Sequence, residues 1–255
     1  MSFTRSVYTV WLRYLAVFRK NIWYGTVTTF VEPILYLLSF GFGLGSYIGQ
    51  IHSGSDSASY RAFVLAGLVG QSVLFTAFFD GAYGGFVRMY YQKIFQAIAV
   101  TPVTLSEVLW GELLWSASRS ILSTSVILLI GAVIGDFSLN GLWLVFPLAF
   151  IGALVFGALG MLAASVSRTI ESLSYPQYLF IFPMFLFCGV YFPLSNLPKA
   201  VQIFAQLLPL TAMLSLVRTA VLGFEFEPWA PVVLMAWLLI SVPLARSKMM
   251  RRLVA

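Results

Sequence analysis

The hydrophobic positions of this chain form long runs that short polar segments interrupt. Most runs approach the about 20 apolar residues that a helix needs to cross the hydrocarbon core of a membrane. The pattern predicts six membrane-spanning helices, at residues 29–48, 62–86, 109–134, 142–166, 175–191 and 229–245. The predicted fold class is therefore an all-α polytopic membrane protein, with a single transmembrane domain over residues 1–255.

One further apolar stretch, residues 200–217, has no charge but contains Pro209, and Pro193 and Pro198 precede it. With six spans and the N-terminus inside, eleven of the 15 Lys and Arg residues lie on the cytoplasmic side. A seventh span would move the basic C-terminal tail outside. The stretch is therefore predicted to be a re-entrant helical hairpin between spans five and six, within an extracellular segment at residues 192–225. Such backbone needs protein or a water-filled cavity as cover, so we expect it to line one.

Residues 1–24 predict an amphipathic helix that lies in the cytoplasmic interface. Its basic side suits anionic lipid or a partner. Its apolar side carries Phe3, Val7, Val10, Trp11, Tyr14, Phe18 and Ile22. The alternative is a segment that only anchors the topology. Because basic residues interrupt the first apolar stretch, it does not have the form of a cleavable signal.

Composition supports a membrane protein and excludes several kinds of chemistry. Hydrophobic residues make up 60% of the chain and charged residues only 9%, too few to cover a soluble globule. The net charge of +6 is interpreted as the basic bias of cytoplasmic loops, not as nucleic-acid binding. Cys188 and His52 are single, so a disulfide or a metal cluster is not expected. Motifs such as G-x-x-x-x-G-K-S/T and G-x-S-x-G are absent, which predicts a non-catalytic chain without a cofactor.

The longest cytoplasmic connection, residues 88–107, predicts a short helix with apolar residues at helical spacing, ended by Thr101-Pro102. An amphipathic helix of this kind suits docking into a groove on another protein. A passive loop is the alternative. The candidate docking residues are Arg88, Tyr91, Lys93, Ile94, Phe95, Ile98, Thr101 and Pro102.

Four charges fall inside or at the ends of the predicted spans: Glu32, Asp80, Glu112 and Arg119. Charges at membrane depth are functional candidates by default, and carboxylates there suggest a proton relay. Structural ion pairing is favoured over a relay, because Glu32 and Glu112 are expected near cytoplasmic helix ends, where a charge can find water or a cation. Glu112 and Arg119 are seven residues apart on one face, so each is expected to meet a partner on another helix.

Aromatic residues form two stripes at helical spacing. In the second span the stripe shares the helix with a glycine face, Gly81, Gly84 and Gly85, that can pack closely against another helix. Packing or an interfacial belt is the ordinary explanation of such stripes. The alternative is a translocation lining on which sugar rings slide. The stripes are Phe75, Phe79, Tyr83, Phe86 and Tyr90 in the second span, and Tyr175, Tyr178, Phe182 and Phe185 in the fifth.

The segment after the fifth predicted span carries a more specific pattern. Its elements are Gly189, Phe192-Pro193, Leu197-Pro198, Gln202, Leu208-Pro209-Leu210 and Arg218. Residues 97–111, with Thr101-Pro102-Val103, add a second matching segment. In these residues, and in the order of its segments over the whole chain, the sequence resembles the membrane subunit of ABC-2 type exporters. It departs at Ala212, where family members often carry a polar or aromatic residue, so no role is transferred to that side chain.

The resemblance implies two six-span subunits side by side in a bacterial inner membrane, with cytoplasmic termini. Each subunit would dock through residues 88–107 on a cytoplasmic ATPase, which holds the ATP and Mg. The implied partners are two ATPase copies, a second copy of this chain or a similar permease, and membrane lipid.

Within the family, the sequence most resembles the nodulation-type subgroup that exports lipo-oligosaccharides, and related polysaccharide exporters. The predicted function is therefore outward transport of a lipid-linked saccharide or similar amphiphile, with efflux of hydrophobic drugs as the alternative. A proton-coupled transporter using Asp80 and Glu112 is disfavoured, because the Pro-broken segment has no early counterpart that would form an internal repeat. An intramembrane enzyme acting on lipid lacks a nucleophile and base.

Overall fold

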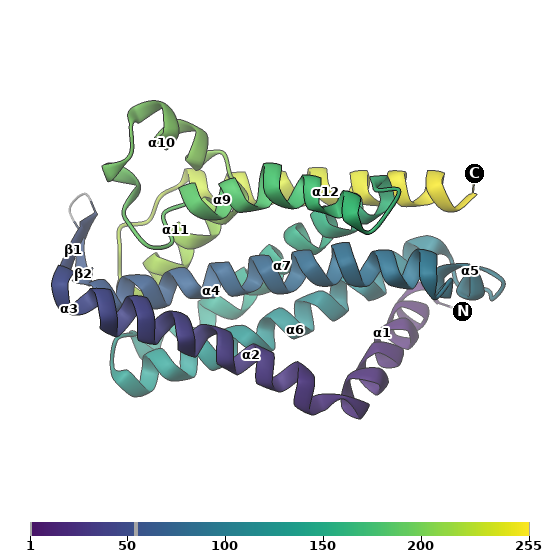
Figure 1. Cartoon of the computed structure of the whole chain (residues 1–255), viewed down its shortest axis with the longest axis horizontal. Coiled ribbons are helices and arrows are strands. Elements are labelled where there is room, and N and C mark those ends of the chain that lie inside the picture. The colour runs from purple at the N-terminus through teal and green to yellow at the C-terminus, as the bar shows by residue number, and fades with distance from the viewer. Residues whose placement is uncertain (1, 54–55, 255) are drawn as a thin grey trace.

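Helices make up most of the chain in the computed structural model, which describes residues 2–53 and 56–254 (Figure 1). Helices dominate because a helix satisfies its own backbone hydrogen bonds inside a membrane. The α-helices are α1 (Phe3–Lys20), α2 (Ile22–Tyr36), α3 (Gly45–Ile48), α4 (Tyr60–Phe79), α5 (Ile94–Ala99), α6 (Leu105–Ile134), α7 (Leu142–Val166), α8 (Ser174–Pro176), α9 (Phe182–Phe187), α10 (Lys199–Gln206), α11 (Pro209–Leu222) and α12 (Trp229–Val254). π-helical turns η1 (Leu37–Leu44), η2 (Asp80–Gly84), η3 (Val87–Tyr91) and η6 (Gln177–Ile181) continue some of them, and short 3₁₀ turns are η4 (Leu139–Gly141), η5 (Glu171–Leu173) and η7 (Leu194–Asn196).

Four helical runs of the described chain are long and apolar enough to cross a membrane: Tyr60–Tyr91, Leu105–Ile134, Leu142–Val166 and Trp229–Arg252. They match the second, third, fourth and sixth predicted spans. The helix α7 lies at the centre of this bundle, against α4, α6 and α12. The first predicted span corresponds to a shorter apolar helical run, Pro33–Ile48.

The fifth predicted span is shorter than the sequence pattern suggested. Its helical turns run through α8, η6 and α9 and end at Phe187. The chain then turns at Gly189, whose φ of 78° lies in the left-handed region that favours glycine. The apolar run therefore continues past the end of the helix, which is why hydropathy alone overestimated its length.

The stretch at residues 200–217 is not one straight helix. It contains α10 and α11, which meet at 85°. The bend falls before Pro209, where Leu208 adopts an extended conformation (φ −85°, ψ 139°). A residue before proline is pushed out of the helical region, and proline then begins a helix well at its first position.

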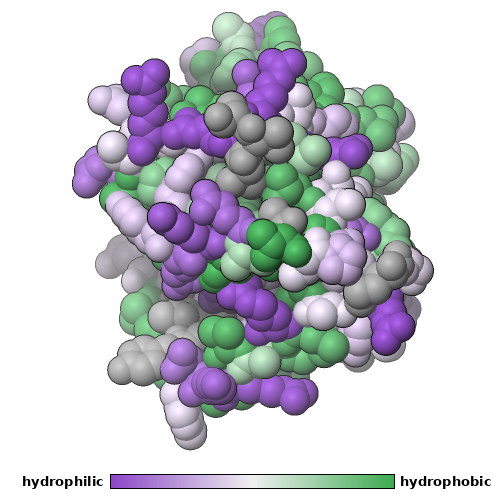
Figure 2. Space-filling view, turned by 90° about the vertical axis from the view of Figure 1, so that its right-hand side faces the viewer, coloured by the Kyte–Doolittle hydropathy of each residue, from purple (hydrophilic) through white to green (hydrophobic). Residues whose placement is uncertain are grey.

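The bundle has two distinct ends (Figure 1). Both chain termini and α5 lie at one, which we call the terminal end. At the other, the hairpin end, α10 lies near an antiparallel pair of strands, β1 (Gln50–Ser53) and β2 (Asp56–Ser59). The sequence pattern did not predict these strands. Figure 2 shows the terminal end, where hydrophilic side chains gather between apolar ones.

The apolar face of α1 packs against protein as well as facing outward. Val7, Val10 and Tyr14 are buried, and Tyr14 packs on Trp115 of α6 with ring centroids 6.0 Å apart. Phe3 at the start of the helix stays half exposed. The helix is therefore fixed to the bundle through its middle, a contact that the prediction of an interfacial helix did not include.

Two residues of the glycine face of the second predicted span, Gly81 and Gly85, pack closely against α7, whereas Gly84 lies against the side chain of Arg88. A Cβ atom at Gly81 would lie 2.6 Å from the carbonyl oxygen of Gly157, and one at Gly85 would lie 2.7 Å from the sulfur of Met161. At Gly81 the neighbouring atoms are main chain and leave no room for a side chain, whereas the flexible Met161 side chain could move away from a Cβ at Gly85. The absence of side chains is thus what lets the two helices approach.

We expect Gly81→Ala to destabilise the bundle by about 1–3 kcal/mol, the usual cost of overpacking. Gly43→Ala is the matched control, because a Cβ there would lie an ordinary 3.5 Å from its nearest neighbour, the carbonyl oxygen of Leu38. The measurement is thermal unfolding of both variants in the same detergent. Equal midpoints for the two variants would contradict this account of the α4–α7 contact.

Candidate functional site

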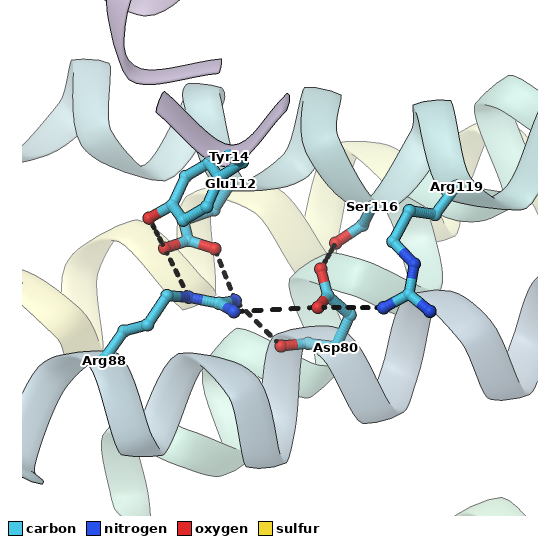
Figure 3. Close-up of polar contacts among 6 residues, drawn as sticks. All are labelled: Tyr14, Asp80, Arg88, Glu112, Ser116 and Arg119. Carbon is cyan, nitrogen blue, oxygen red and sulfur yellow. Dashed lines mark hydrogen bonds and ion pairs between the residues drawn. The ribbon is translucent and has the colours of Figure 1, made fainter. Parts of the chain in front are cut away.

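Four charged side chains from two antiparallel helical runs meet inside the bundle, nearer its terminal end (Figure 3). Asp80 and Arg88 lie eight residues apart after α4, and Glu112 and Arg119 lie seven apart on α6. Both spacings are about two helical turns, so each pair shares a face of its helix. In each run the acid precedes the arginine. Antiparallel packing therefore places each acid opposite the arginine of the other run.

The strongest contact is between Arg88 and Glu112. Arg88 Nη2 lies 2.6 Å from Glu112 Oε2, and Arg88 Nε donates to Glu112 Oε1 at 3.0 Å. This two-point geometry is the preferred pairing of guanidinium and carboxylate. Glu112 is almost fully buried, with 1% of its surface exposed. A carboxylate so buried is stable in its charged form only with such partners.

Asp80 joins the two arginines into one network. Its Oδ1 lies 3.6 Å from Arg88 Nη1 and 3.6 Å from Arg119 Nη1, and its Oδ2 accepts a hydrogen bond from Ser116 Oγ at 3.1 Å. Arg88 also donates to the main-chain carbonyl oxygen of Asp80 at 3.0 Å. Two acids and two arginines give the cluster no net formal charge. As expected from their spacing, Glu112 and Arg119 each meet a partner on the other helical run.

The N-terminal helix is tied into the same network. The hydroxyl of Tyr14 donates to Glu112 Oε1, and the guanidinium of Arg88 lies 5.1 Å from the centre of the Tyr14 ring. Burial raises the pKa of the Tyr14 hydroxyl, so the phenol stays protonated and available as a donor. Trp11 Nε1 adds a hydrogen bond to Ser118 Oγ at 2.9 Å. The sequence pattern placed Tyr14 on an apolar face and gave no signal of this polar role.

The expected docking face of residues 88–107 is partly wrong. Phe95, together with Met89, is fully buried in the chain's own core, and Ile94 and Ile98 pack partly against it. The helix α5 does lie in this segment and ends before Thr101-Pro102, as predicted. Helical spacing identified the apolar face correctly but could not distinguish a face for a partner from a face for the same chain. The exposed positions among the described residues of the segment are Tyr91, Gln92, Lys93, Gln96, Ala97, Val100, Thr101, Pro102 and Thr104.

The two aromatic stripes pack against each other. Phe75 contacts Phe182 and Phe185 at 6.1 and 5.1 Å between ring centroids, and the Tyr83 hydroxyl donates to Gln177 Oε1 at 2.6 Å. Tyr178 stacks on Phe182 at 5.3 Å and remains 62% exposed. Phe86, by contrast, is buried. The rows thus form a partly open aromatic surface along α4, η6 and α9.

The motif after the fifth helical segment is held together by Arg218 of α11. Its Nη2 donates to the carbonyl oxygen of Gly189 at 2.6 Å, and its guanidinium lies 3.6 Å from the centre of the Phe63 ring. The first and last residues of the sequence motif are therefore direct partners. Phe192 and Pro193 lie between them in the turn, and Pro198 caps the start of α10. The side chain of Glu32 lies outside the described residues.

Comparison with known proteins decides the family of this chain. The family model described as "ABC-2 type transporter" matches residues 5–222. The chain belongs to the ABC-2 type transporter family. It is therefore a membrane transport subunit, as the motif residues indicated.

Relatives within this family cover most of the chain. Nodulation protein J of Bradyrhizobium diazoefficiens is 34% identical over 84% of this chain and 80% of its own length. Nodulation protein J of Rhizobium leguminosarum bv. viciae is 30% identical over 95% of this chain and 94% of its own. The inner membrane transport permease YadH of Escherichia coli is 26% identical over 86% and 84%. The range matched by the family model spans the ion network and the Arg218 segment.

We expect Glu112→Leu to lower the free energy of unfolding by about 3–5 kcal/mol, because Arg88 loses its close partner while it stays buried. Adding Arg88→Met should restore most of the lost stability, because no unpaired arginine is then buried. Asp80 still has Arg119 and Ser116 as partners. Arg246→Met, which removes an exposed bond to Ser106, is the control and should change little. Denaturant unfolding in micelles measures all variants. If the double variant is no more stable than Glu112→Leu alone, the account in which Arg88 and Glu112 neutralise each other is contradicted.

Proposed function

We propose that this chain is the permease subunit of an ATP-driven exporter that moves a lipid-linked saccharide or similar amphiphile outward across the inner membrane. Two copies side by side would form the path. The observation that carries the proposal is the partly open aromatic surface along α4, η6 and α9, in a chain that belongs to the ABC-2 family. The similarity to two nodulation proteins J supports the resemblance to the nodulation-type subgroup, from which this cargo class was expected.

The proposed topology has six spans, with a re-entrant α10–α11 hairpin at the outer side. Depth along neighbouring helices supports it. Trp237 Nε1 donates to the carbonyl oxygen of Leu207, at the bend between α10 and α11. Trp237 is eight residues into α12, about 12 Å along the helix from its outer end, so the bend lies at that depth. At the other end of α11, the carbonyl oxygen of Val221 accepts from the backbone of Ser138, in the outer turn between α6 and α7. The helix α11 therefore begins inside the bundle and ends back at its outer face.

The proposed ATPase partner docks at the terminal end, on the exposed positions of the connecting segment rather than on Phe95. Val100 is 88% exposed there, and Lys93 lies at the start of α5. Arg88 begins this segment and is held by Asp80 and Glu112. A displacement of the segment by the ATPase would therefore pull on α4, α6 and α1 together. ATP and Mg belong to the partner in this proposal.

An amphiphilic cargo fits the aromatic surface physically. Its acyl chain can stay in lipid while flat rings contact the sugar, each worth about 0.5–1.5 kcal/mol by analogy with aromatic pairs. Contacts of that size guide a sugar without trapping it. Hydrophobic drugs would also contact such a surface, so drug efflux is the alternative that the cargo experiment below must separate.

The topology proposal predicts which sites react with an impermeant thiol reagent in intact cells. In a Cys188→Ser background, Asn196→Cys and Phe226→Cys should both react, because both ends of a re-entrant hairpin lie outside. Lys248→Cys, on the exposed side of the C-terminal helix, should react only after permeabilisation. If only one of Asn196→Cys and Phe226→Cys reacts in intact cells, the two sites lie on opposite sides of the membrane, and α10 and α11 together form one bent span.

The cargo proposal predicts that the double variant Phe79→Leu, Tyr83→Leu exports a fluorescent lipid-linked oligosaccharide about fivefold or more slowly, since two ring contacts are lost. Tyr83→Phe is the matched control, because it keeps the ring and removes only the hydrogen bond to Gln177. The assay uses vesicles that contain the permease and its ATPase. Unchanged saccharide export, with reduced efflux of an apolar dye, would favour the drug exporter.

A further inference from the structure

A polar cavity of about 500 Å³ lies at the hairpin end, where α10, α11 and the first residue of α12 come together. Its wall combines carboxylates, an arginine, amides and hydroxyls with aromatic rings. Neither the aromatic surface nor the ion network includes these residues. Those that carry the argument are Asp56, Gln206, Ser215, Arg218, Glu227 and Trp229.

The wall is held open by contacts between its own residues. Asp56 Oδ2 accepts from the backbone of Glu225 at 2.9 Å, and Glu227 Oε2 accepts from Ser215 Oγ at 2.9 Å. These bonds fix two carboxylates while leaving further lone pairs, since each carboxylate can accept about four hydrogen bonds. The cavity is therefore preformed rather than created by a ligand.

Arg218 is the unusual part of this wall. Only 8% of its surface is exposed, and its Nε has no hydrogen-bond partner among the described residues. Its Nη2 donates to main-chain carbonyls of Gly189 and Val190. A buried polar group without a partner costs free energy, and Arg218 is the one cation among the described residues that line this wall.

The charges of the wall disfavour an inorganic anion. Its described residues include three carboxylates, those of Asp56, Glu225 and Glu227, and one arginine, Arg218, so the net formal charge of the wall is −2. A sugar matches both kinds of group, because each hydroxyl can donate to a carboxylate and accept from an amide or guanidinium. The apolar face of a sugar ring also fits against Trp229, since pockets of this kind combine rings with a few placed polar groups.

We propose that this cavity is a binding subsite for a neutral sugar unit of the cargo on the outer side of the membrane. The inference rests on the proposed saccharide export and adds where the sugar is received. The cavity lies beside the outer end of α11, so a sugar that leaves the aromatic surface meets hydrogen-bonding groups there. Hydrogen bonds to the wall would hold the sugar until the acyl chain of the cargo follows it.

The test uses the purified chain in phospholipid nanodiscs, because maltoside detergents would themselves present a sugar. Tryptophan fluorescence, to which Trp229 contributes, is followed while cellotetraose, maltotetraose or the β-linked tetramer of N-acetylglucosamine is added. At least one should give a saturable response, and sodium sulfate and spermidine should give none. The double variant Gln206→Ala, Glu227→Gln should bind that saccharide at least tenfold more weakly.

Asn196→Ala is the control variant, because Asn196 is exposed near the cavity but does not line it. Matching thermal unfolding of the parent, double variant and control establishes that folding is intact. No saturable response to any tetrasaccharide, saturable binding of sulfate or spermidine instead, or equal binding by the double variant would overturn the subsite. Export of the fluorescent lipid-linked oligosaccharide by the complete transporter is measured separately. If the purified chain binds no tetrasaccharide while the complete transporter still exports the oligosaccharide, the subsite is contradicted and the proposed function is not.

Discussion

Charge neutralisation inside the bundle is the constraint on which the arrangement of the helices depends. A carboxylate or guanidinium at membrane depth is expensive unless an opposite charge lies against it. Here two antiparallel runs each carry an acid followed by an arginine, and the order makes the pairing reciprocal. Sliding one run by a single turn would separate Arg88 from Glu112. The network therefore specifies the register of α6 against the run that follows α4.

This register also positions the parts at the terminal end. Tyr14 joins α1 to Glu112, while Arg88 stands where the connecting segment begins. The glycine contacts between Gly81 and α7 lie directly beside Asp80, so close packing and ion pairing reinforce each other at one level. The segment that precedes α5 is therefore joined to α1, α6 and α7 by ion pairs, a hydrogen bond and close packing, the kinds of contact through which coupling travels in proteins.

The sequence predicted the features that depend on one helix at a time. Four long apolar runs became long helices, and the spacing of Glu112 and Arg119 correctly required partners on another helix. Features that depend on which surfaces meet were not accessible. Phe95 looked available for a partner because a helical pattern does not say what covers it. The role of Tyr14 and the early end of α9 depend in the same way on tertiary contacts and on one glycine conformation.

The distribution of polar groups along the molecule bears on the kind of solute it can carry. Four fixed charges pair with one another near the terminal end, the aromatic rows offer rings and a few hydroxyls, and the wall of the cavity beside α10 contains three acids and Arg218. An anionic solute would need an excess of positive charge among these groups to offset the loss of its hydration, and the cavity wall has an excess of negative charge instead. A neutral sugar needs only hydrogen bonds and flat apolar contacts, both of which the described surfaces supply in order. In the proposed export, an amphiphile with an uncharged head would therefore face a lower electrostatic barrier than one with an anionic head.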